Sequence, residues 1–211
     1  MPQERQIQDL SQAVKPLLII ASGPSVNEVN LSLFSDFHVM IINRPAPIKA
    51  TYWHLNDRDI VIKYQNELKS FDGLILTNTG CKIPLKNVKY FAIKRGMGWT
   101  DEPNHYHLAR TSTWSAMQVA VKLGYKKIVV IGIDQGFTNK PYYGDHEYMA
   151  EPEHRQNKFN GEAAAFEHFP QEHQDKFLFC ANNKYEWFAK SKWHCSPNDM
   201  YNLLPSFLSQ T

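Results

Sequence analysis

The stretch LLIIASGPSV, residues 17–26, decides the fold. Its four consecutive aliphatic residues, Leu17–Ile20, are typical of a strand buried on both faces, as in a parallel sheet. The run stops at Ser22-Gly23-Pro24-Ser25, where glycine and proline break the strand and two hydroxyl groups flank them. Such a break is either a plain turn or a loop that binds a polar ligand.

Further apolar runs indicate more strands of the same kind. With the first strand they cover Lys15–Ala21, Phe37–Ile42, Thr51–Leu55, Gly73–Leu76, Val88–Ile93, Lys127–Ile131 and a short Lys192–Cys195. Helices are predicted over Arg58–Lys69, Ser112–Leu123, Asn183–Lys190 and Asn198–Leu204. This alternation predicts an α/β fold, a Rossmann-like and mostly parallel sheet flanked by helices.

Two polar segments do not fit this pattern. Arg95–Leu108 is rich in glycine, proline, histidine and tryptophan, and Gly136–Gln174 is a long stretch with little periodicity. A loop of that length in a compact domain is usually a lid, a binding insertion or disordered. We therefore expect one Rossmann-like nucleotide-binding domain over residues 1–211, with a lid-like insertion at 136–174.

Composition limits the classes of function. The 23 basic and 21 acidic side chains give a net charge of only +2, so the chain as a whole does not require nucleic acid as a partner. Three cysteines without metal-type spacing favour a reducing, cytoplasmic location. No apolar stretch is long enough for a membrane span, and the first residues lack the pattern of a signal peptide.

Polar residues follow nearly every predicted strand, and parallel strands end at one edge of a sheet. We expect one polar crevice there, although loops are often polar simply because they cap helices. The groups in chain order are Ser22-Gly23-Pro24-Ser25, Asn43-Arg44, Asn56-Asp57-Arg58-Asp59, Thr77-Asn78-Thr79-Gly80, Gly132-Ile133-Asp134-Gln135 and Ser196-Pro197-Asn198.

The first of these groups is suited to a nucleoside more than to a chain of phosphates. Asn43 lies twenty positions after Gly23, about where dinucleotide folds carry the residue that binds ribose. The full glycine fingerprint and a P-loop lysine are absent from the sequence, and Pro24 lacks an N–H. Contact with a sugar, a base or a single phosphate is therefore expected.

Charged residues suggest two further sites, each with a plain structural alternative. Arg110 and Thr113 at the start of the best helix could bind an anion, or the hydroxyls there could simply cap the helix. Asp57 and Asp59 form a D-x-D pair that could hold a divalent metal, or Asp59 could favour the start of a helix.

Four histidines lie in the insertion: His146, His154, His168 and His173. One of them could serve as a general base, because the pKa of histidine is near neutral pH. A zinc site has little support, since no cysteine or tight repeat accompanies them. Most of the four are expected to be solvated loop residues.

Four segments, in order, resemble motifs of two related families: IIASGPSV, INRP, ARTSTWSAMQVAVKLGYKKIVVIGIDQGF and WHCSPNDMYNLLP. One is the bacterial sialyltransferase family typified by the Campylobacter lipooligosaccharide enzymes. The other is the MptE-like family, which includes an archaeal 6-hydroxymethyl-dihydropterin diphosphokinase and uncharacterised phage proteins. The resemblance implies a Rossmann-like fold that binds a nucleotide.

The sialyltransferase resemblance also implies roles for individual residues. Nucleoside contacts would come from Gly23, Pro24, Ser25, Asn43 and Asn56, with Arg110 and Thr113 at the donor or acceptor site. Tyr142 and its neighbour Tyr143 would stabilise the departing phosphate, and His168, or else His173, would be the base. The nearer family tyrosine aligns with Gly136, so part of that phosphate clamp is missing or displaced.

The sequence thus leads to three hypotheses. The first is a glycosyltransferase that uses a nucleotide sugar and needs no metal. Its acceptor would be a glycan or, as a second choice, a modified base in phage DNA stacked on Trp99, Tyr106 or Trp114. The second is an MptE-like diphosphokinase that uses ATP and Mg²⁺ held by Asp57, Asp59 and Asp134. The third is a non-catalytic nucleotide-binding phage protein. A homo-oligomer is compatible with each of them.

Overall fold

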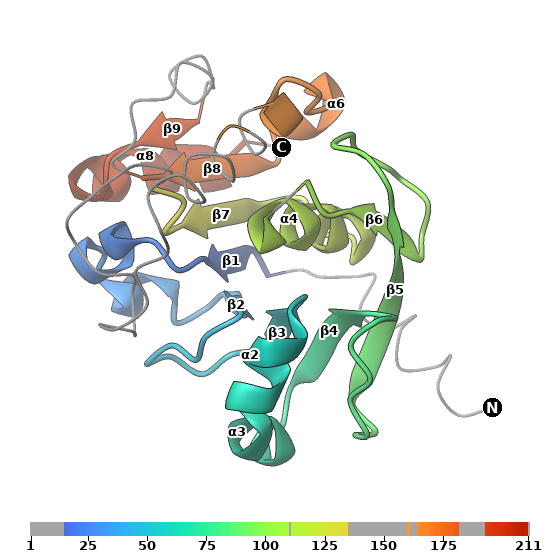
Figure 1. Ribbon diagram of the computed structural model, residues 1–211. Coiled ribbons are helices and arrows are strands. Elements are labelled where there is room, and N and C mark those ends of the chain that lie inside the picture. The colour runs from blue at the N-terminus through green and yellow to red at the C-terminus, as the bar shows by residue number, and fades with distance from the viewer. Residues whose placement is uncertain (1–14, 110, 135–159, 161–163, 182–192, 211) are drawn as a thin grey trace.

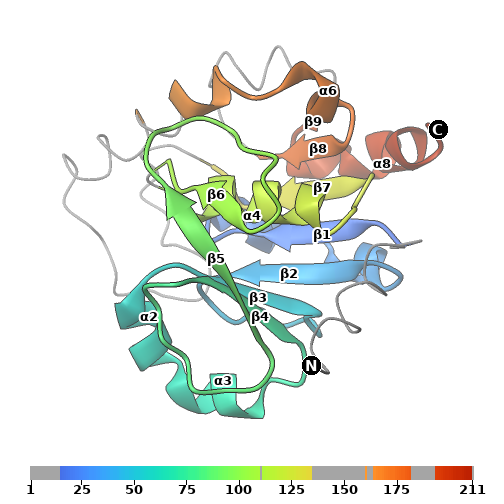
Figure 2. The same cartoon turned by 90° about the vertical axis from the view of Figure 1, so that its right-hand side faces the viewer.

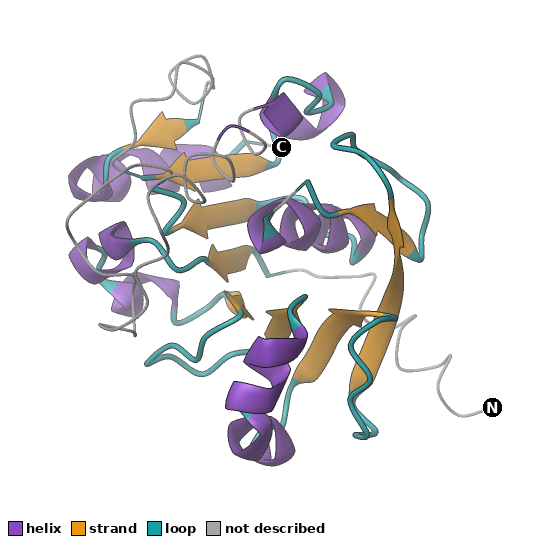
Figure 3. Cartoon of the chain, viewed as in Figure 1, coloured by secondary structure: helices purple, strands orange, loops and turns teal. Residues whose placement is uncertain are grey.

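A parallel nine-stranded sheet forms the centre of the computed structural model (Figure 1). The structure describes residues 15–109, 111–134, 160, 164–181 and 193–210. Within these residues the strand order is β6-β5-β4-β3-β2-β1-β7-β8-β9, and every neighbouring pair is parallel. Helices cover both faces of the sheet (Figure 3). The predicted Rossmann-like α/β class is confirmed.

The strands are short, and four of the nine are buried along their whole length. Their bounds are β1 Leu17–Ile20, β2 His38–Ile42, β3 Tyr52–Leu55, β4 Leu74–Asn78, β5 Val88–Lys94, β6 His105–His107, β7 Ile128–Ile131, β8 Phe177–Cys180 and β9 His194–Cys195. The α-helices are α2 Arg58–Lys63, α3 Gln65–Ser70, α4 Ser112–Lys122, α6 Gln171–Gln174 and α8 Met200–Leu208. Three 3₁₀ helices complete the described elements: η2 Pro24–Glu28, η3 Leu31–Phe34 and η4 Pro197–Asp199.

The chain reverses its direction across the sheet between β1 and β7. From β1 the strands progress outward to β6, and α4 then returns the chain to β7 on the other side of β1. Ile20 pairs with Ile41 on one side and with Ile131 on the other. In open α/β sheets, ligands bind at such a switch point, beyond the carboxyl ends of the strands. We call that side of the sheet the carboxyl edge.

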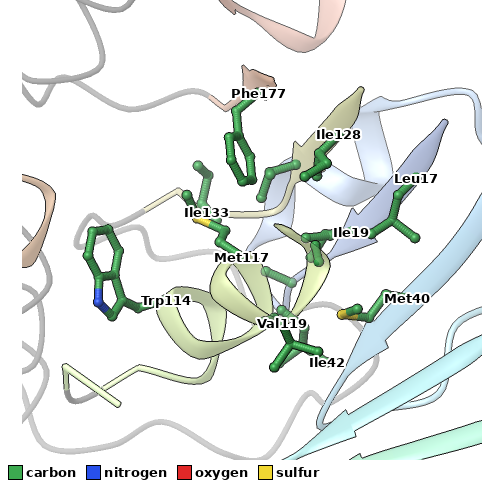
Figure 4. Packing of buried hydrophobic residues seen from close by; sticks show 14 of the residues in the cluster. Leu17, Ile19, Met40, Ile42, Trp114, Met117, Val119, Ile128, Ile133 and Phe177 are labelled. Carbon is green, nitrogen blue, oxygen red and sulfur yellow. The ribbon is translucent and has the colours of Figure 1, made fainter. Parts of the chain in front are cut away.

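Two hydrophobic cores, one on each face, hold the sheet between its helices. Ile19 points to the core beneath α4, while Leu18 and Ile20 point to the opposite core, which α8 covers. The alternation follows from the pleat, which sends successive side chains to opposite faces. Figure 4 shows Met117 and Val119 of α4 packed toward the side chains of the central strands. Burial on both faces explains why these strands read as continuous apolar runs.

The predicted strand positions are confirmed to within two residues at each end, but two strands were missed. β6 lies in Arg95–Leu108, which was predicted to lie outside the core, and its Tyr106 is fully buried. Figure 2 shows β6 beside α4, where it closes one side of the core. β8, with the sequence FLFC, is the other missed strand.

Two of the predicted helices differ from the helices of the structure. The predicted helix at Arg58–Lys69 is two helices, because the chain leaves helical geometry at Tyr64. The helix predicted at Asn198–Leu204 begins as η4 and continues as α8 to Leu208. The helix predicted at Asn183–Lys190 lies outside the described residues.

The end of the predicted insertion belongs to the core. Phe166 and Phe169 are buried and pack on Trp114, Phe177 and Phe179. The lid-like character expected for Gly136–Gln174 is therefore wrong for residues 164–174. Residues 135–159 and 161–163 lie outside the described part of the chain.

The three cysteines, Cys81, Cys180 and Cys195, are buried and carry free thiols. Among the described helices, none has the length and apolar character needed to cross a membrane.

Candidate functional site

The turn after β1 is bound to the loop after β7. The Gly23 N–H donates to the Gly132 carbonyl at 2.7 Å, and the Ser25 N–H donates to Oδ2 of Asp134 at 2.7 Å in a buried position. Parallel pairing of β1 with β7 places these two segments side by side. The predicted site residues Gly23, Ser25 and Asp134 therefore do lie together at the carboxyl edge.

Two glycines make this close approach feasible. A Cβ at Gly23 would lie 2.3 Å from Oδ2 of Asp134 and 2.4 Å from the Gly132 carbonyl oxygen. Gly132 has φ +76°, and a Cβ there would lie 2.6 Å from a methyl group of Val26. Neither position tolerates a side chain unless the backbone moves.

Ser25 carries a buried polar group that lacks a hydrogen-bond partner in the described part of the chain. Pro24 occupies the first turn of η2, where its missing N–H is harmless, and Ser22 precedes the turn in a half-buried position. Ser25 is 1% exposed, and its Oγ has no hydrogen-bond partner among the described residues. Buried hydroxyl groups are normally hydrogen-bonded, so an unpaired one marks a place where a ligand or water could bind.

Asn43, at the end of β2, carries a second polar group for which the described residues supply no partner. Its backbone is left-handed, with φ 60°, and its N–H donates to the His54 carbonyl at 2.9 Å. Its Nδ2 donates to Oγ of Ser112 at 3.3 Å, while its buried Oδ1 has no partner in the described chain. Asparagine tolerates this conformation better than most residues. The Asn43 amide therefore joins β2 to the start of α4 and keeps one acceptor unused.

The start of α4 is capped by Thr111, whose Oγ1 accepts the Trp114 N–H at 3.3 Å. A hydroxyl group therefore does cap this helix, as the structural alternative proposed. It belongs to Thr111 and not to Ser112 or Thr113. Both of those residues are 9% exposed and lie at the carboxyl edge. Arg110 lies outside the described residues, so its expected role at an anion site stays a prediction.

Asn56, at the end of β3, is committed to a buried network. Its Nδ2 donates to Ser115 Oγ at 2.8 Å and lies 3.1 Å from His54 Nε2, and its Oδ1 accepts from the Tyr106 hydroxyl. Its backbone carbonyl accepts from Asn78 Nδ2 at 2.9 Å. An amide has two donor hydrogens, and both of these have protein partners here. Asn56 therefore positions its neighbours, and of the two asparagines Asn43 is the one with an unused acceptor.

His54 is the centre of this network and was not singled out from the sequence. Its Nε2 lies 2.8 Å from Oγ of Ser115, and its Nδ1 is unpaired within the described chain. Complete burial lowers the pKa of His54 to about 3, because desolvation penalises the charged ring. The imidazole is therefore neutral at physiological pH. Two features of the sequence could have pointed to this network. His54 lies in the strand-like run TYWHL, and Ser112 and Ser115 are spaced one helical turn apart in the predicted helix.

The Asp57 and Asp59 pair is exposed at the start of α2. Among the described residues, Asp57, Asp59 and Asp134 do not form a group that could share a metal ion. The described group that meets that criterion is Asp101, Glu172 and His173. The three carboxylates expected to hold Mg²⁺ are therefore not brought together in this structure.

His173 lies just before β8 begins, at the edge of the sheet opposite the carboxyl edge. Its Nε2 is 3.1 Å from Oδ1 of Asp101, and its Nδ1 is 3.0 Å from Nζ of Lys176. Burial raises the pKa of Asp101, but hydrogen bonds from His173 and Trp99 outweigh it, and the pKa lies below its ordinary value. Both ring nitrogens of His173 are engaged, and a lysine at one of them disfavours a bound cation. His173 is therefore neither a free base nor a residue of the carboxyl edge.

His168, the preferred base, is exposed in the turn between Phe166 and Phe169. Its side chain makes no hydrogen bond with any described residue, so its role as a base stays a prediction. Ser196 caps η4, because its Oγ accepts the Asp199 N–H at 3.3 Å and donates to the Asp199 carboxylate at 2.6 Å. Tyr142, Tyr143, His146 and His154 lie outside the described residues.

The base-stacking hypothesis is wrong for two of its three aromatic residues. Tyr106 and Trp114 are fully buried in the core. Trp99 packs edge-on against Trp114 and Phe169, and its indole donates to Asp101. Tyr106 and Trp114 thus offer no free ring face to a nucleobase.

No protein-family model, curated protein or solved structure gave a significant match to the chain. Support for a function therefore comes from the geometry of the carboxyl edge.

Proposed function

We propose that the protein is a glycosyltransferase that moves a sugar from a nucleotide sugar to an acceptor hydroxyl. One observation carries the proposal: Ser25 Oγ, in the turn after β1, and Asn43 Oδ1, directly after the neighbouring strand β2, are buried and have no hydrogen-bond partner among the described residues. Both lie beside the switch point of the sheet, where α/β folds bind nucleotides. Neutral hydroxyl and amide groups complement the hydroxyls and base edges of a nucleoside.

The reaction proposed is an in-line displacement. His168 removes the proton of the acceptor hydroxyl, whose oxygen attacks the anomeric carbon of the donor sugar. The bond from that carbon to the phosphate oxygen breaks, and the nucleotide leaves with the electron pair. Arg110, Thr113, Tyr142 and Tyr143 would bind the leaving phosphate and stabilise its charge. The acceptor proposed is a glycan.

A thermal-shift panel tests this function. We expect stabilisation by a cytidine or uridine nucleotide sugar in the presence of EDTA, since the proposed reaction needs no metal. Stabilisation by ATP with Mg²⁺ alone would instead support a diphosphokinase. An unchanged melting temperature across the panel would contradict both enzymes and leave a non-catalytic protein.

The proposed base is tested by His168→Ala. Turnover should fall by about 10²-fold or more, while donor affinity stays within a few-fold, because a general base acts on the chemical step. The matched control is His173→Ala, whose side chain lies at the opposite edge of the sheet. Unchanged turnover in His168→Ala would exclude this histidine as the base.

A further inference from the structure

The turn from Ser22 to Ser25 has little capacity left for an anion. Gly23 donates its N–H to Gly132, Pro24 has no N–H, Ser25 donates to Asp134, and Val26 donates to the Gly23 carbonyl at 3.3 Å. Dinucleotide folds use backbone N–H groups at this location to bind phosphate. Here the N–H groups of residues 23, 25 and 26 are all engaged by the protein itself.

The partner of the Ser25 N–H is itself an anion. Oδ2 of Asp134 accepts this hydrogen bond at 2.7 Å and lies against Gly23, in a buried position. A phosphate placed at this turn would have to displace the carboxylate or lie next to it. Like charges at contact distance in a partly dehydrated site repel strongly.

What the turn still offers is neutral. The Ser25 hydroxyl is buried and unpaired among the described residues, and the unpaired Oδ1 of Asn43 lies at the end of the adjacent strand. Both groups can form hydrogen bonds with the hydroxyls of a sugar, and neither carries a charge.

From these contacts we propose that Asp134 is a specificity-determining residue, which closes the Ser22–Ser25 turn to phosphate and reserves it for the uncharged nucleoside half of the ligand. That the turn binds a nucleoside rests on the proposed function, whereas the exclusion of phosphate from the turn does not. The phosphates of a bound nucleotide then point away from β1 and β7.

Backbone NMR of the full chain tests this proposal, with the Ser25 amide resonance as the readout. In the wild-type protein, pyrophosphate should leave the Ser25 resonance unmoved and a pyrimidine nucleoside should move it. In Asp134→Ala, which frees the N–H and removes the charge, pyrophosphate should move it, with an affinity about tenfold or more above any wild-type value. The matched control is Asp199→Ala, which removes a carboxylate from η4 at the same edge and should behave as wild type.

Each result has a defined meaning. A wild-type Ser25 resonance that moves with pyrophosphate overturns the exclusion of phosphate. A resonance that pyrophosphate moves in neither protein shows that Asp134 is not what excludes it, and also overturns the proposal. If Asp134→Ala does not fold, the titrations of the wild-type protein with pyrophosphate and with the nucleoside decide. A nucleoside that binds without moving the Ser25 resonance then counts against the proposal. A protein that binds no nucleoside at all contradicts the nucleoside half and the proposed function, while the pyrophosphate comparison still tests the exclusion.

Discussion

Gln118 of α4 forms a complete pair of hydrogen bonds with the backbone of His107 in β6. Its Nε2 donates to the His107 carbonyl at 2.9 Å, and its Oε1 accepts the His107 N–H at 3.1 Å. The same Oε1 accepts the Thr100 N–H at 3.3 Å. Of the described strands, β6 is the last on its side of the sheet, where backbone groups would otherwise lack partners. The buried Gln118 amide thus supplies hydrogen-bond partners to backbone groups along the outer side of β6.

Replacing Gln118 should therefore destabilise the fold strongly for a single substitution. Gln118→Leu keeps the volume but leaves three backbone groups without partners, which should cost about 3 kcal/mol of the free energy of unfolding. Urea denaturation measures this difference. The control Gln65→Ala, at an exposed position of α3, should change the free energy by less than about 0.5 kcal/mol. Equal stability of Gln118→Leu and wild type would contradict the role of Gln118.

His54 should make stability depend on pH. Its folded pKa of about 3 lies below the unfolded value of 6.5, so the unfolded chain takes up the proton first as the pH falls. The contribution is complete above pH 6.5 and is lost as the pH falls toward 3. Between pH 7 and pH 5 the loss should be about 2 kcal/mol.

The test is to compare urea denaturation of His54→Gln and wild type at several pH values. The variant should be less stable at neutral pH and show a shallower decline toward acid. The exposed His168→Gln should keep the wild-type pH dependence. Parallel declines for His54→Gln and wild type would show that His54 is not the titrating group.

Tyr106 should matter through its hydroxyl as well as its ring. The hydroxyl donates to Oδ1 of Asn56 in the buried network, and Tyr106→Phe leaves that oxygen unpaired. We expect a loss of about 1–2 kcal/mol in the free energy of unfolding. Chemical denaturation checks this value against Tyr201→Phe, where the ring is exposed and no measurable change is expected. A Tyr106→Phe protein as stable as the control would show that the bond adds nothing.

Asn43 should affect binding more than folding. Asn43→Gly suits the left-handed backbone at φ 60° and removes the amide. We expect affinity for the best nucleotide of the panel to fall about tenfold, because one hydrogen bond to the ligand is lost. Calorimetric titration measures affinity, and the melting temperature measured alongside should change little. Unaltered affinity would remove Asn43 from the proposed site.

Much of the fold was predictable because the central strands are buried on both faces. Leu17–Ile20 and Ile128–Ile131 read as strands for that reason. β6 was missed because it has three residues, two of them histidines, between breaker-rich segments. Its stability comes from Tyr106 and from Gln118, which are contacts that local sequence does not reveal.

The candidate site was predictable in location but less so in detail. Polar strand ends correctly indicated that Gly23, Asn43 and Asp134 share one edge. The sequence could not show that the Asn56 side-chain amide contacts Ser115 and His54, because these contacts depend on how α4 packs over β3. His173 remained the alternative to His168 as the base until the structure placed it just before β8, where Asp101 and Lys176 engage its two ring nitrogens.

The central claim is that the ends of β1 and β2 bind a nucleoside. The most direct measurement is a crystal structure of the protein with the nucleotide that gives the largest thermal shift. We expect the nucleoside within hydrogen-bond distance of Ser25 Oγ and Asn43 Oδ1. A nucleotide bound elsewhere, for example beside Asp101 and His173, or a panel in which no nucleotide binds, would contradict the claim.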